Sequence, residues 1–231
     1  MFVTIVFVSP RREPVSRRQR PAKAPLSRES LVGVAFRVMR EEGLERVTMR
    51  RLASELDTGP ASLYVYVRNT VELHGALLDE LLADFVLPGL DTPVGWEERL
   101  IDLLCRYTEL LHGYPSLARS MLTLLPHGPR YLRLIDCVLG LLHTGGVSAR
   151  NAAWGVDLLL QHATSTAAEH GTREESVTGE DEMETLASVA AEASPERYPH
   201  LARAREELFS GTGRERMRWS FEVLMKGIKT T

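Results

Sequence analysis

Residues 48–66 read TMRRLASELDTGPASLYVY and predict two short helices joined by a three-residue turn. Thr48 supplies an N-cap oxygen for the first helix, whose apolar side chains share one face. Asp57 and Thr58 then break this helix, because short polar side chains bond to their own backbone and Asp tolerates a left-handed turn conformation. Pro60 is favoured at the first position of a helix, where its missing N–H is not needed. The stretch therefore predicts a helix-turn-helix.

The second of these helices turns one side toward the first helix and another toward solvent. Leu63 and Val67 point back to the first helix at i, i+4 spacing. In a helix-turn-helix the second helix lies in the major groove of DNA, where its first residues meet the base edges. The residues predicted to lie at the exposed surface are Pro60, Ala61, Ser62, Tyr64, Val65 and Tyr66. An ordinary αα-hairpin in a helical domain has the same short pattern, so these residues alone leave that alternative open.

Two further helices are predicted on either side of this motif. Ser27 caps a helix that continues to about residue 42 and ends at Gly43. Asn69 and Glu72 form a start similar to a capping box for a fourth helix, which the apolar spacing extends to about residue 85. The first N–H groups of this helix would form a phosphate site beside the second helix of the motif.

The sequence of these four helices resembles a known family. The segments AFRVMREEGLERVTMRRLASEL, ASLYVYVRN and ELHGALLDELL, within residues 27–82, are similar to the DNA-binding domain of the TetR family of bacterial repressors. Downstream, YPSLARSMLTLLPHGPRYLRLIDCVLGLLHTGGVSARNAAW and RERMRWSFEVLMKGI are similar to the regulatory domain of the tetracycline-repressor branch. The resemblance implies an all-α fold, with a three-helix helix-turn-helix domain joined through a fourth helix to a helical ligand-binding and dimerisation domain. It also implies that Thr48 and Tyr64 contact phosphates.

Two positions depart from the pattern of that family. Members often carry Gly where Asp57 stands, and Lys where Thr70 stands at the start of the fourth helix. Because Thr70 lacks the charge of that Lys, we expect part of its phosphate-binding role to pass to Arg50, Arg68 and the backbone N–H of Thr70. The residues expected to bind DNA are Thr48, Arg50, Arg51, Pro60, Ala61, Ser62, Tyr64, Val65, Tyr66, Arg68 and Thr70.

Charge is distributed unevenly along the chain. Residues 1–70 hold 13 Lys and Arg against 7 Asp and Glu, whereas the remaining residues hold 15 against 24. A basic head on an acidic body fits a DNA-binding domain joined to another domain, although solvated surfaces alone give such asymmetry as well. Six of the positive charges lie in residues 11–23. Residues 1–26 are therefore expected to be a disordered basic arm, either following DNA or forming a solvated tail.

Residues 71–231 are predicted to form a helical regulatory and dimerisation domain. Apolar spacing and Pro or Gly boundaries predict helices over residues 96–112, 117–125, 130–143, 148–170 and 214–229, with an acidic mobile loop over 172–184 that becomes helical near Asp181. The resemblance implies that the helices over 148–170 and 214–229 pair with those of a second copy as a four-helix bundle. Their apolar stripes consist of Ala152, Val156, Leu159, Leu160, Ala163, Met217, Phe221, Leu224, Met225 and Ile228. The core of a single subunit would use such stripes in the same way.

Motifs for catalysis and metal binding are missing from the sequence. It contains no HExxH, CxxC or GxSxG, and the glycines at 145 and 146 end a helix instead of opening a phosphate loop. Cys105 and Cys137 lie in apolar helical runs, as reduced core residues of a cytosolic protein do. No apolar run is long enough to span a bilayer, including residues 1–8. We therefore expect a cytoplasmic protein that is not an enzyme, holds no metal or cofactor, and does not enter a membrane.

A small-molecule site is expected between the helices of the body, because large apolar side chains with a few polar tips are typical of such sites. The expected lining residues are Trp96, Tyr107, Met121, Tyr131, Trp154, Gln161 and His162. With the resemblance, these features predict a homodimeric transcriptional regulator, expected to be a repressor. Its residues 27–70 would bind a palindromic operator, and a small-molecule inducer would release it. The main alternative is a helical small-molecule-binding protein or enzyme without a DNA function.

Overall fold

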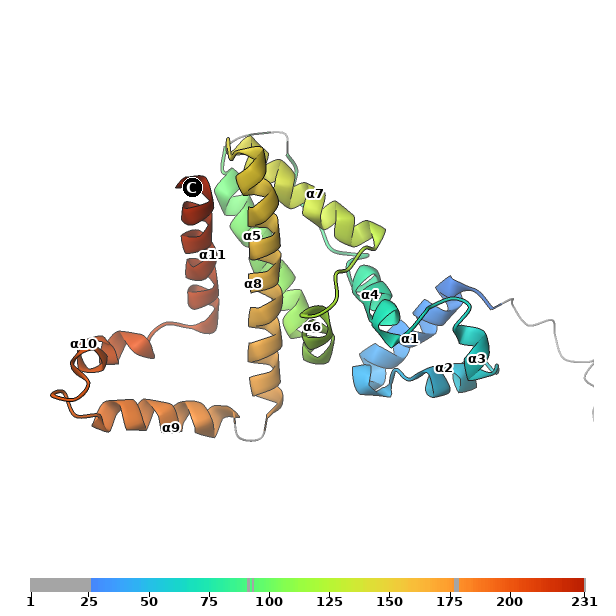
Figure 1. Cartoon of the computed structure of the whole chain (residues 1–231), viewed down its shortest axis with the longest axis horizontal. Helices are drawn as coiled ribbons and strands as arrows, with labels where there is room; N and C mark the ends of the chain where they lie inside the picture. The colour runs from blue at the N-terminus through green and yellow to red at the C-terminus, as the bar shows by residue number, and fades with distance from the viewer. Residues whose placement is uncertain (1–25, 91, 93, 177–178, 231) are drawn as a thin grey trace, which may run out of the picture.

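The computed structural model of the chain describes residues 26–90, 92, 94–176 and 179–230, which form eleven α-helices, a short 3-10 helix and no strand (Figure 1). The elements are α1 (Arg28–Glu42), η2 (Leu44–Arg46), α2 (Met49–Glu55), α3 (Pro60–Leu63), α4 (Thr70–Leu81), α5 (Trp96–His112), α6 (Pro115–Met121), α7 (Pro129–Thr144), α8 (Ala149–Glu175), α9 (Gly179–Glu192), α10 (Pro199–Leu208) and α11 (Gly213–Thr230). The predicted all-α class is confirmed. The predicted basic arm lies outside the described residues, apart from Leu26.

The head, formed by α1, η2, α2 and α3, lies at one end of the molecule (Figure 1). The Ser27 hydroxyl accepts a hydrogen bond from the Ser30 N–H at 3.1 Å, and the Ser30 hydroxyl accepts one from the Ser27 N–H at 2.9 Å. This reciprocal cap fixes the start of α1. Leu31 and Val38 of α1 and Leu52 of α2 are fully buried in the core of the head.

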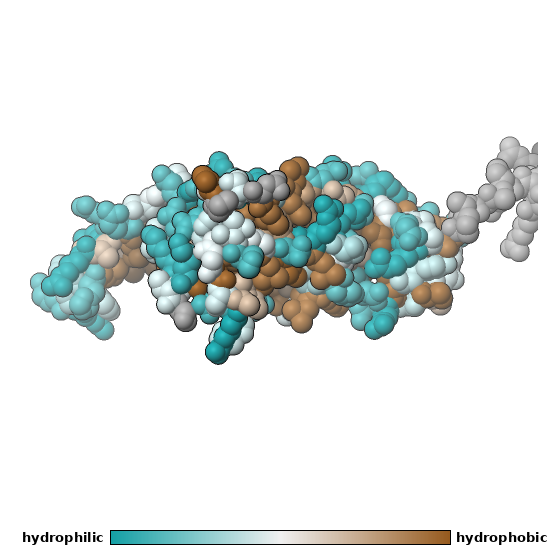
Figure 2. Space-filling view, turned by 90° about the horizontal axis from the view of Figure 1, so that it is seen from above, coloured by the Kyte–Doolittle hydropathy of each residue, from teal (hydrophilic) through white to brown (hydrophobic). Residues whose placement is uncertain are grey.

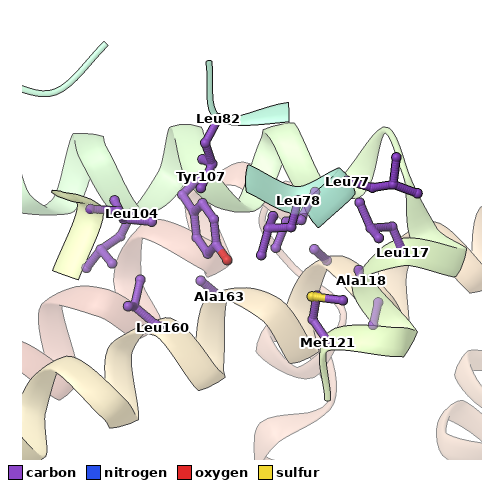
Figure 3. Close-up of a cluster of buried hydrophobic side chains, with 14 of the residues drawn as sticks. Leu77, Leu78, Leu82, Leu104, Tyr107, Leu117, Ala118, Met121, Leu160 and Ala163 are labelled. Atoms are coloured by element: carbon purple, nitrogen blue, oxygen red, sulfur yellow. The ribbon is translucent and has the colours of Figure 1, made fainter. Parts of the chain in front are cut away.

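Helix α4 lies between the head and the body, which consists of α5–α11. It packs against α1 on one side and against α6 and α7 on the other. Figure 3 shows Leu77 and Leu78 of α4 beside Leu117 of α6, with the ring of Tyr107 from α5 close by, and all four side chains are buried. Because such a core is close-packed, a displacement of α6 or α7 reaches α4 directly.

The helix predicted over residues 69–85 is shorter in the structure. It ends at Leu81, and the chain turns back toward α5 over residues 82–84. Phe85 then meets the ring of Tyr107 edge-on, with 6.3 Å between the ring centroids. The apolar spacing continues past the helix because these side chains enter the core from a turn.

Helix α8 is the longest element of the body, with 27 residues, and packs against α5, α6, α7 and α11. Three predicted boundaries are corrected around it. The helix predicted over 117–125 begins at Pro115 and ends at Met121, and the one predicted over 148–170 continues to Glu175. The loop predicted over 172–184 is largely helical, because α8 takes its first residues and α9 begins at Gly179.

Helices α9 and α10 project from the body at the end opposite the head (Figure 1). Ala190 is the one described residue of this pair whose side chain is buried. In the view from above, apolar residues reach the surface over the middle of the molecule, whereas hydrophilic residues dominate the projecting end (Figure 2). Within the described ranges, no helix combines the length and the apolar character that a membrane crossing requires.

Candidate DNA interface and ligand cavity

The helix-turn-helix of the head begins at a hydrogen-bonded cap. Thr48 Oγ1 accepts a hydrogen bond from the Arg51 N–H at 3.1 Å and starts α2. Asp57 has a φ of 48°, the left-handed conformation that the turn requires, and Pro60 occupies the first position of α3. Helices α2 and α3 pack against each other, so the predicted helix-turn-helix is confirmed.

Helix α3 and the turn after it present an exposed face. Leu63 and Val67 are buried against the head, as their spacing predicts. Tyr64 is 51% exposed and Val65 is 80% exposed, and the side chains of Pro60, Ala61 and Ser62 also lie at the surface. Large apolar and aromatic side chains that remain exposed on a small domain are available to a partner.

Tyr66 is turned away from this exposed face, and its predicted place at the exposed surface is corrected. Its hydroxyl donates a hydrogen bond of 2.7 Å to the carbonyl of Leu26, and its half-buried ring packs on the core. Tyr66 therefore ties the end of the motif to the chain just before α1. The helical spacing fails here because α3 ends at Leu63 and residues 64–66 continue as a turn.

Basic side chains around the motif differ in how much of their charge is available. Arg51 pairs with Glu42 at 2.8 Å and with Glu55 at 3.0 Å, so its charge is partly neutralised within the head. Arg50 and Arg68 are exposed, and no described residue forms an ion pair with either of them. Arg50 and Arg68 are therefore better placed than Arg51 to meet a phosphate.

The start of α4 follows directly on the motif. Asn69 Oδ1 accepts a hydrogen bond from the Glu72 N–H at 2.8 Å, and the Glu72 carboxylate accepts one from the Arg68 N–H at 2.8 Å. Thr70 is the exposed first residue of α4. Its N–H is one of the groups that no preceding helical turn can satisfy, and such groups attract anions.

A cavity of about 300 Å³ lies between α5, α6, α7 and α8. Segment 122–126, which follows α6, forms one wall of it, and Ile135 of α7 and Leu160 of α8 form others. Hydroxyl, amide and carboxylate groups interrupt these apolar walls, a composition that suits a small organic molecule. Four residues expected from the sequence line this cavity, namely Tyr107, Met121, Tyr131 and Gln161.

The two tyrosines of the cavity keep their hydroxyl protons. Burial raises the pKa of Tyr107 far above its usual value. Burial and, to a lesser degree, the negative charge of Asp157 raise the pKa of Tyr131. A neutral phenol both donates and accepts hydrogen bonds, so each tyrosine can orient a polar group of a ligand.

Three expected pocket residues lie outside this cavity. Trp96 packs over Gly145, where an added Cβ would lie 2.2 Å from the ring. His162 Nε2 lies 2.6 Å from the Ser220 hydroxyl, so its ring faces α11. Trp154 is 65% exposed on the outer side of α8. The sequence predicts these residues in the pocket because their side chains are large. In the structure, each side chain points away from the cavity.

Sequence reasoning missed part of the cavity wall. Asp157 and Thr164 line it together with Gln161. These three positions recur at i, i+4 and i+7, so they form a polar stripe on α8 beside its apolar stripe. That stripe is the signal that could have located the wall. Segment 122–126 was hidden because its residues continue the apolar pattern of α6.

The stripes expected at a dimer interface belong mainly to the core of the subunit. Nine of the ten residues are buried, and Leu224 is half-buried. The buried ones are Ala152, Val156, Leu159, Leu160, Ala163, Met217, Phe221, Met225 and Ile228. Val156 and Leu160 also line the cavity. Within one subunit these side chains hold α8 and α11 to each other and to the rest of the body, and their contact with a second copy stays a prediction.

A second apolar surface lies on the outer side of α8 and α11. It consists of Trp154 and Leu158 on α8 and Trp219 and Val223 on α11, each between 42% and 65% exposed. A groove of about 330 Å³ runs along it and reaches Leu224 and Ile228. We call these four exposed residues and the groove the outer apolar face.

Reactive groups outside these regions are few. In the described part of the chain, no three His, Cys, Asp or Glu side chains gather as metal ligands would. Cys105 and Cys137 are buried free thiols, and burial raises the pKa of Cys105 to about 11. A thiol with so high a pKa is a poor nucleophile at neutral pH.

Comparison with solved structures and with characterised proteins finds proteins that are similar to this chain over most of its length. A putative transcription regulator, SCO7704 from Streptomyces coelicor, is 47% identical with a TM-score of 0.75, covering 90% of this chain and 97% of the other. The TetR family protein ActR from Streptomyces coelicolor, in complex with actinorhodin, is 29% identical with a TM-score of 0.78, covering 89% and 96%. The HTH-type transcriptional repressor DrrR1 of Streptomyces coeruleorubidus is 27% identical over 225 residues, which cover 90% of this chain and 82% of DrrR1.

Two family models match the chain in order. The model described as bacterial regulatory proteins, tetR family, matches residues 31–77, which contain the helix-turn-helix. The model described as tetracyclin repressor-like, C-terminal domain, matches residues 87–231, which contain the cavity. The chain therefore belongs to the TetR family of bacterial regulatory proteins, which are DNA-binding transcriptional regulators and not enzymes.

Proposed function

We propose that this protein is a ligand-responsive transcriptional repressor, which binds a palindromic operator as a homodimer and releases it when a small molecule enters the cavity. The position of α4 carries this proposal, because α4 packs on both the head and the walls of the cavity. The complex of ActR with actinorhodin supports a small organic molecule as the effector, and the name of DrrR1 favours repression. Acting on chromosomal DNA would place the protein in the bacterial cytoplasm.

The DNA-binding part comprises residues 27–70 in this proposal, and residues 71–231 form the regulatory part. The exposed side of α3 enters the major groove, where Ala61 and Val65 can contact thymine methyl groups and Ser62 can bond to a base edge. Tyr64, Arg50 and Arg68 are exposed and would meet phosphates.

Two copies would pair through the outer apolar face. Trp154 on α8 and Trp219 on α11 expose large rings there, and these are the two longest helices of the body. Burying such a face against its own copy gives a two-fold interface and removes apolar surface from water. Two heads related by a two-fold axis match a palindromic operator, whose half-sites lie about one helical turn apart or a multiple of it.

Helix α4 would transmit ligand binding to the head, because it contacts both α7 and α6, which form walls of the cavity. Asp79 Oδ1 accepts hydrogen bonds from the Arg130 N–H at 2.8 Å and the Tyr131 N–H at 3.0 Å, and Tyr131 lines the cavity. On the other side, His74 Nδ1 lies 2.6 Å from the hydroxyl of Ser120, the residue before the cavity wall. A ligand that binds better to the arrangement with displaced walls therefore moves α4 and the heads.

An electrophoretic mobility shift tests the DNA function, with a fragment from upstream of the protein's own gene. The full chain should retard the fragment, and Arg50→Ala should weaken binding about fivefold or more. Arg133→Ala removes the same charge from the exposed side of α7 and serves as the matched control. Equal behaviour of the two variants, or a failure to retard selected and unselected DNA alike, would leave a helical small-molecule-binding protein as the better interpretation.

A further inference from the structure

Asp157 is the one charged residue among those that line the cavity. The other polar groups of the described wall are neutral: two phenols, the hydroxyls of Thr123 and Thr164, and the amide of Gln161. Asp157 has no hydrogen bond or ion pair with any described residue. Asp157 is exposed at the edge of these apolar walls, so its carboxylate is open to a positively charged group of a ligand.

Two basic side chains on the neighbouring turns are engaged elsewhere. Arg130, at the start of α7, pairs with Glu80 at 2.9 Å. Arg150, earlier on α8, lies over the ring of Trp154, with its guanidinium carbon 4.3 Å from the ring centroid. The cavity therefore keeps a net negative charge at Asp157, which attracts cations and repels anions.

Two further residues with oxygen acceptors line the same cavity as Asp157. Asp157 lies close enough to Tyr131 for its charge to raise the pKa of the phenol, in addition to the larger effect of burial. Gln161 follows Asp157 by one helical turn and lines the same wall. The carboxylate, the phenol oxygen and the amide oxygen are three acceptors, and an ammonium group has three N–H donors.

We propose that the cavity selects an organic molecule with a protonated amine, whose ammonium binds Asp157 while its apolar ring system lies against Met121, Ile135 and Leu160. This inference rests on the proposed function of the cavity as the effector site. It makes Asp157 the residue that determines specificity by charge, and it disfavours ligands that present a carboxylate to α8.

Isothermal titration calorimetry of the full chain with three naphthalene probes tests the proposal. The probes carry an ethylamine, an ethanol or an acetate group on the same ring position and differ mainly in charge. The amine should bind about fivefold more tightly than the alcohol, and the acetate should bind most weakly. Asp157→Asn should remove the preference for the amine and leave the affinity for the alcohol within about twofold.

Two further variants locate the effect. Asp136→Asn removes an exposed carboxylate from α7 outside the cavity and should keep the preference for the amine. Ile135→Trp fills the cavity and should weaken all three probes. If the wild-type chain binds amine and alcohol equally while Ile135→Trp still blocks both, the charge selection is refuted and the cavity remains a ligand site. If no probe binds, or if Ile135→Trp changes nothing, the effector site itself is refuted.

Discussion

Replacing Asp79 by Ala should break the joint between α4 and α7. The Asp79 side chain is buried, at 7% exposure, and receives two backbone N–H groups from the first turn of α7. Helix α7 has no capping side chain of its own, because its N-cap residue is Gly128. A Cβ at Gly128 would lie 2.1 Å from Asp79 Oδ1, so the glycine makes room for the carboxylate. Asp79 therefore caps α7 from another helix.

The size of the effect follows from these bonds. A hydrogen bond to a charged acceptor contributes about 1.5–3 kcal/mol, and leaving a buried donor unsatisfied costs about 1–3 kcal/mol. Because water can reach part of the vacated space, we expect Asp79→Ala to lower the free energy of unfolding by about 3 kcal/mol. Asp79→Asn keeps an oxygen acceptor and should cost about 1 kcal/mol.

Urea unfolding followed by circular dichroism, at one fixed protein concentration and neutral pH, measures these differences. Asp102→Ala is the matched control, because Asp102 forms an exposed pair with Arg106 at 2.8 Å, which contributes about 0.5 kcal/mol or less. A loss for Asp79→Ala no larger than that of this control would refute the capping argument. In operator-binding assays, Asp79→Ala should also reduce the response to ligand, since α4 loses its bond to the cavity wall.

Three other outcomes are expected. Tyr64→Ala should weaken binding to all DNA sequences about fivefold, whereas Ser62→Ala should change sequence preference; fluorescence anisotropy on a panel of operators separates the two, and a uniform loss in both would contradict the assigned roles. Trp154→Glu or Val223→Glu should give monomers in sedimentation velocity with unchanged helicity, because both side chains lie on the outer apolar face; a persistent dimer would exclude that face as the interface. Burial lowers the pKa of His74 below 6.5, so the unfolded chain takes up the proton first and stability falls as the pH drops through that value. Urea titrations at about pH 7.5 and about pH 5.5 should show a smaller loss in His74→Asn, and an equal loss would exclude this residue as the cause.

Local signals in the sequence place most helices well. The helix predicted over 96–112 agrees with α5, and the cap at Thr48 with Pro60 defines the motif of the head. Pro115 shows the limit of such signals, since a proline either follows a helix or starts one. The sequence predicts that the next helix begins only at residue 117, whereas in the structure Pro115 begins α6. Packing of α6 against α8 decides between these roles, and a local pattern does not contain that contact.

Orientation around a helix was the less predictable part. Helices α8 and α11 have apolar residues on two sides, and periodicity alone selects the larger stripe. Phe221 belongs to that stripe and is fully buried, while Trp154 and Trp219 on the outer side are exposed. Which stripe faces the subunit's own core depends on the contacts of α5 with both helices, and these residues are far apart in the chain.

The lining of the cavity likewise depends on contacts between residues that are far apart in the chain. Tyr107 and Gln161 line it as expected, whereas Asp157 and Thr164 were missed, because the polar stripe that they form with Gln161 does not itself show that it faces a cavity. A site made by residues from four helices leaves only such partial signals in each helix.

The length of α8 would let a ligand in the cavity act on a distant contact with the head. Asp157 at the cavity and Thr172 near the far end share one continuous helix and lie about 22 Å apart along its axis. Thr172 accepts a hydrogen bond from Arg119 at 2.5 Å, and the same guanidinium lies 3.9 Å from Glu45 of the head. A rotation of α8 by about 5° around the cavity would carry Thr172 through about 2 Å, which is more than a hydrogen bond tolerates. A rigid helix of this length would convert a small adjustment at the cavity into a larger displacement near the head, so in the proposed function a ligand would not have to deform the protein strongly.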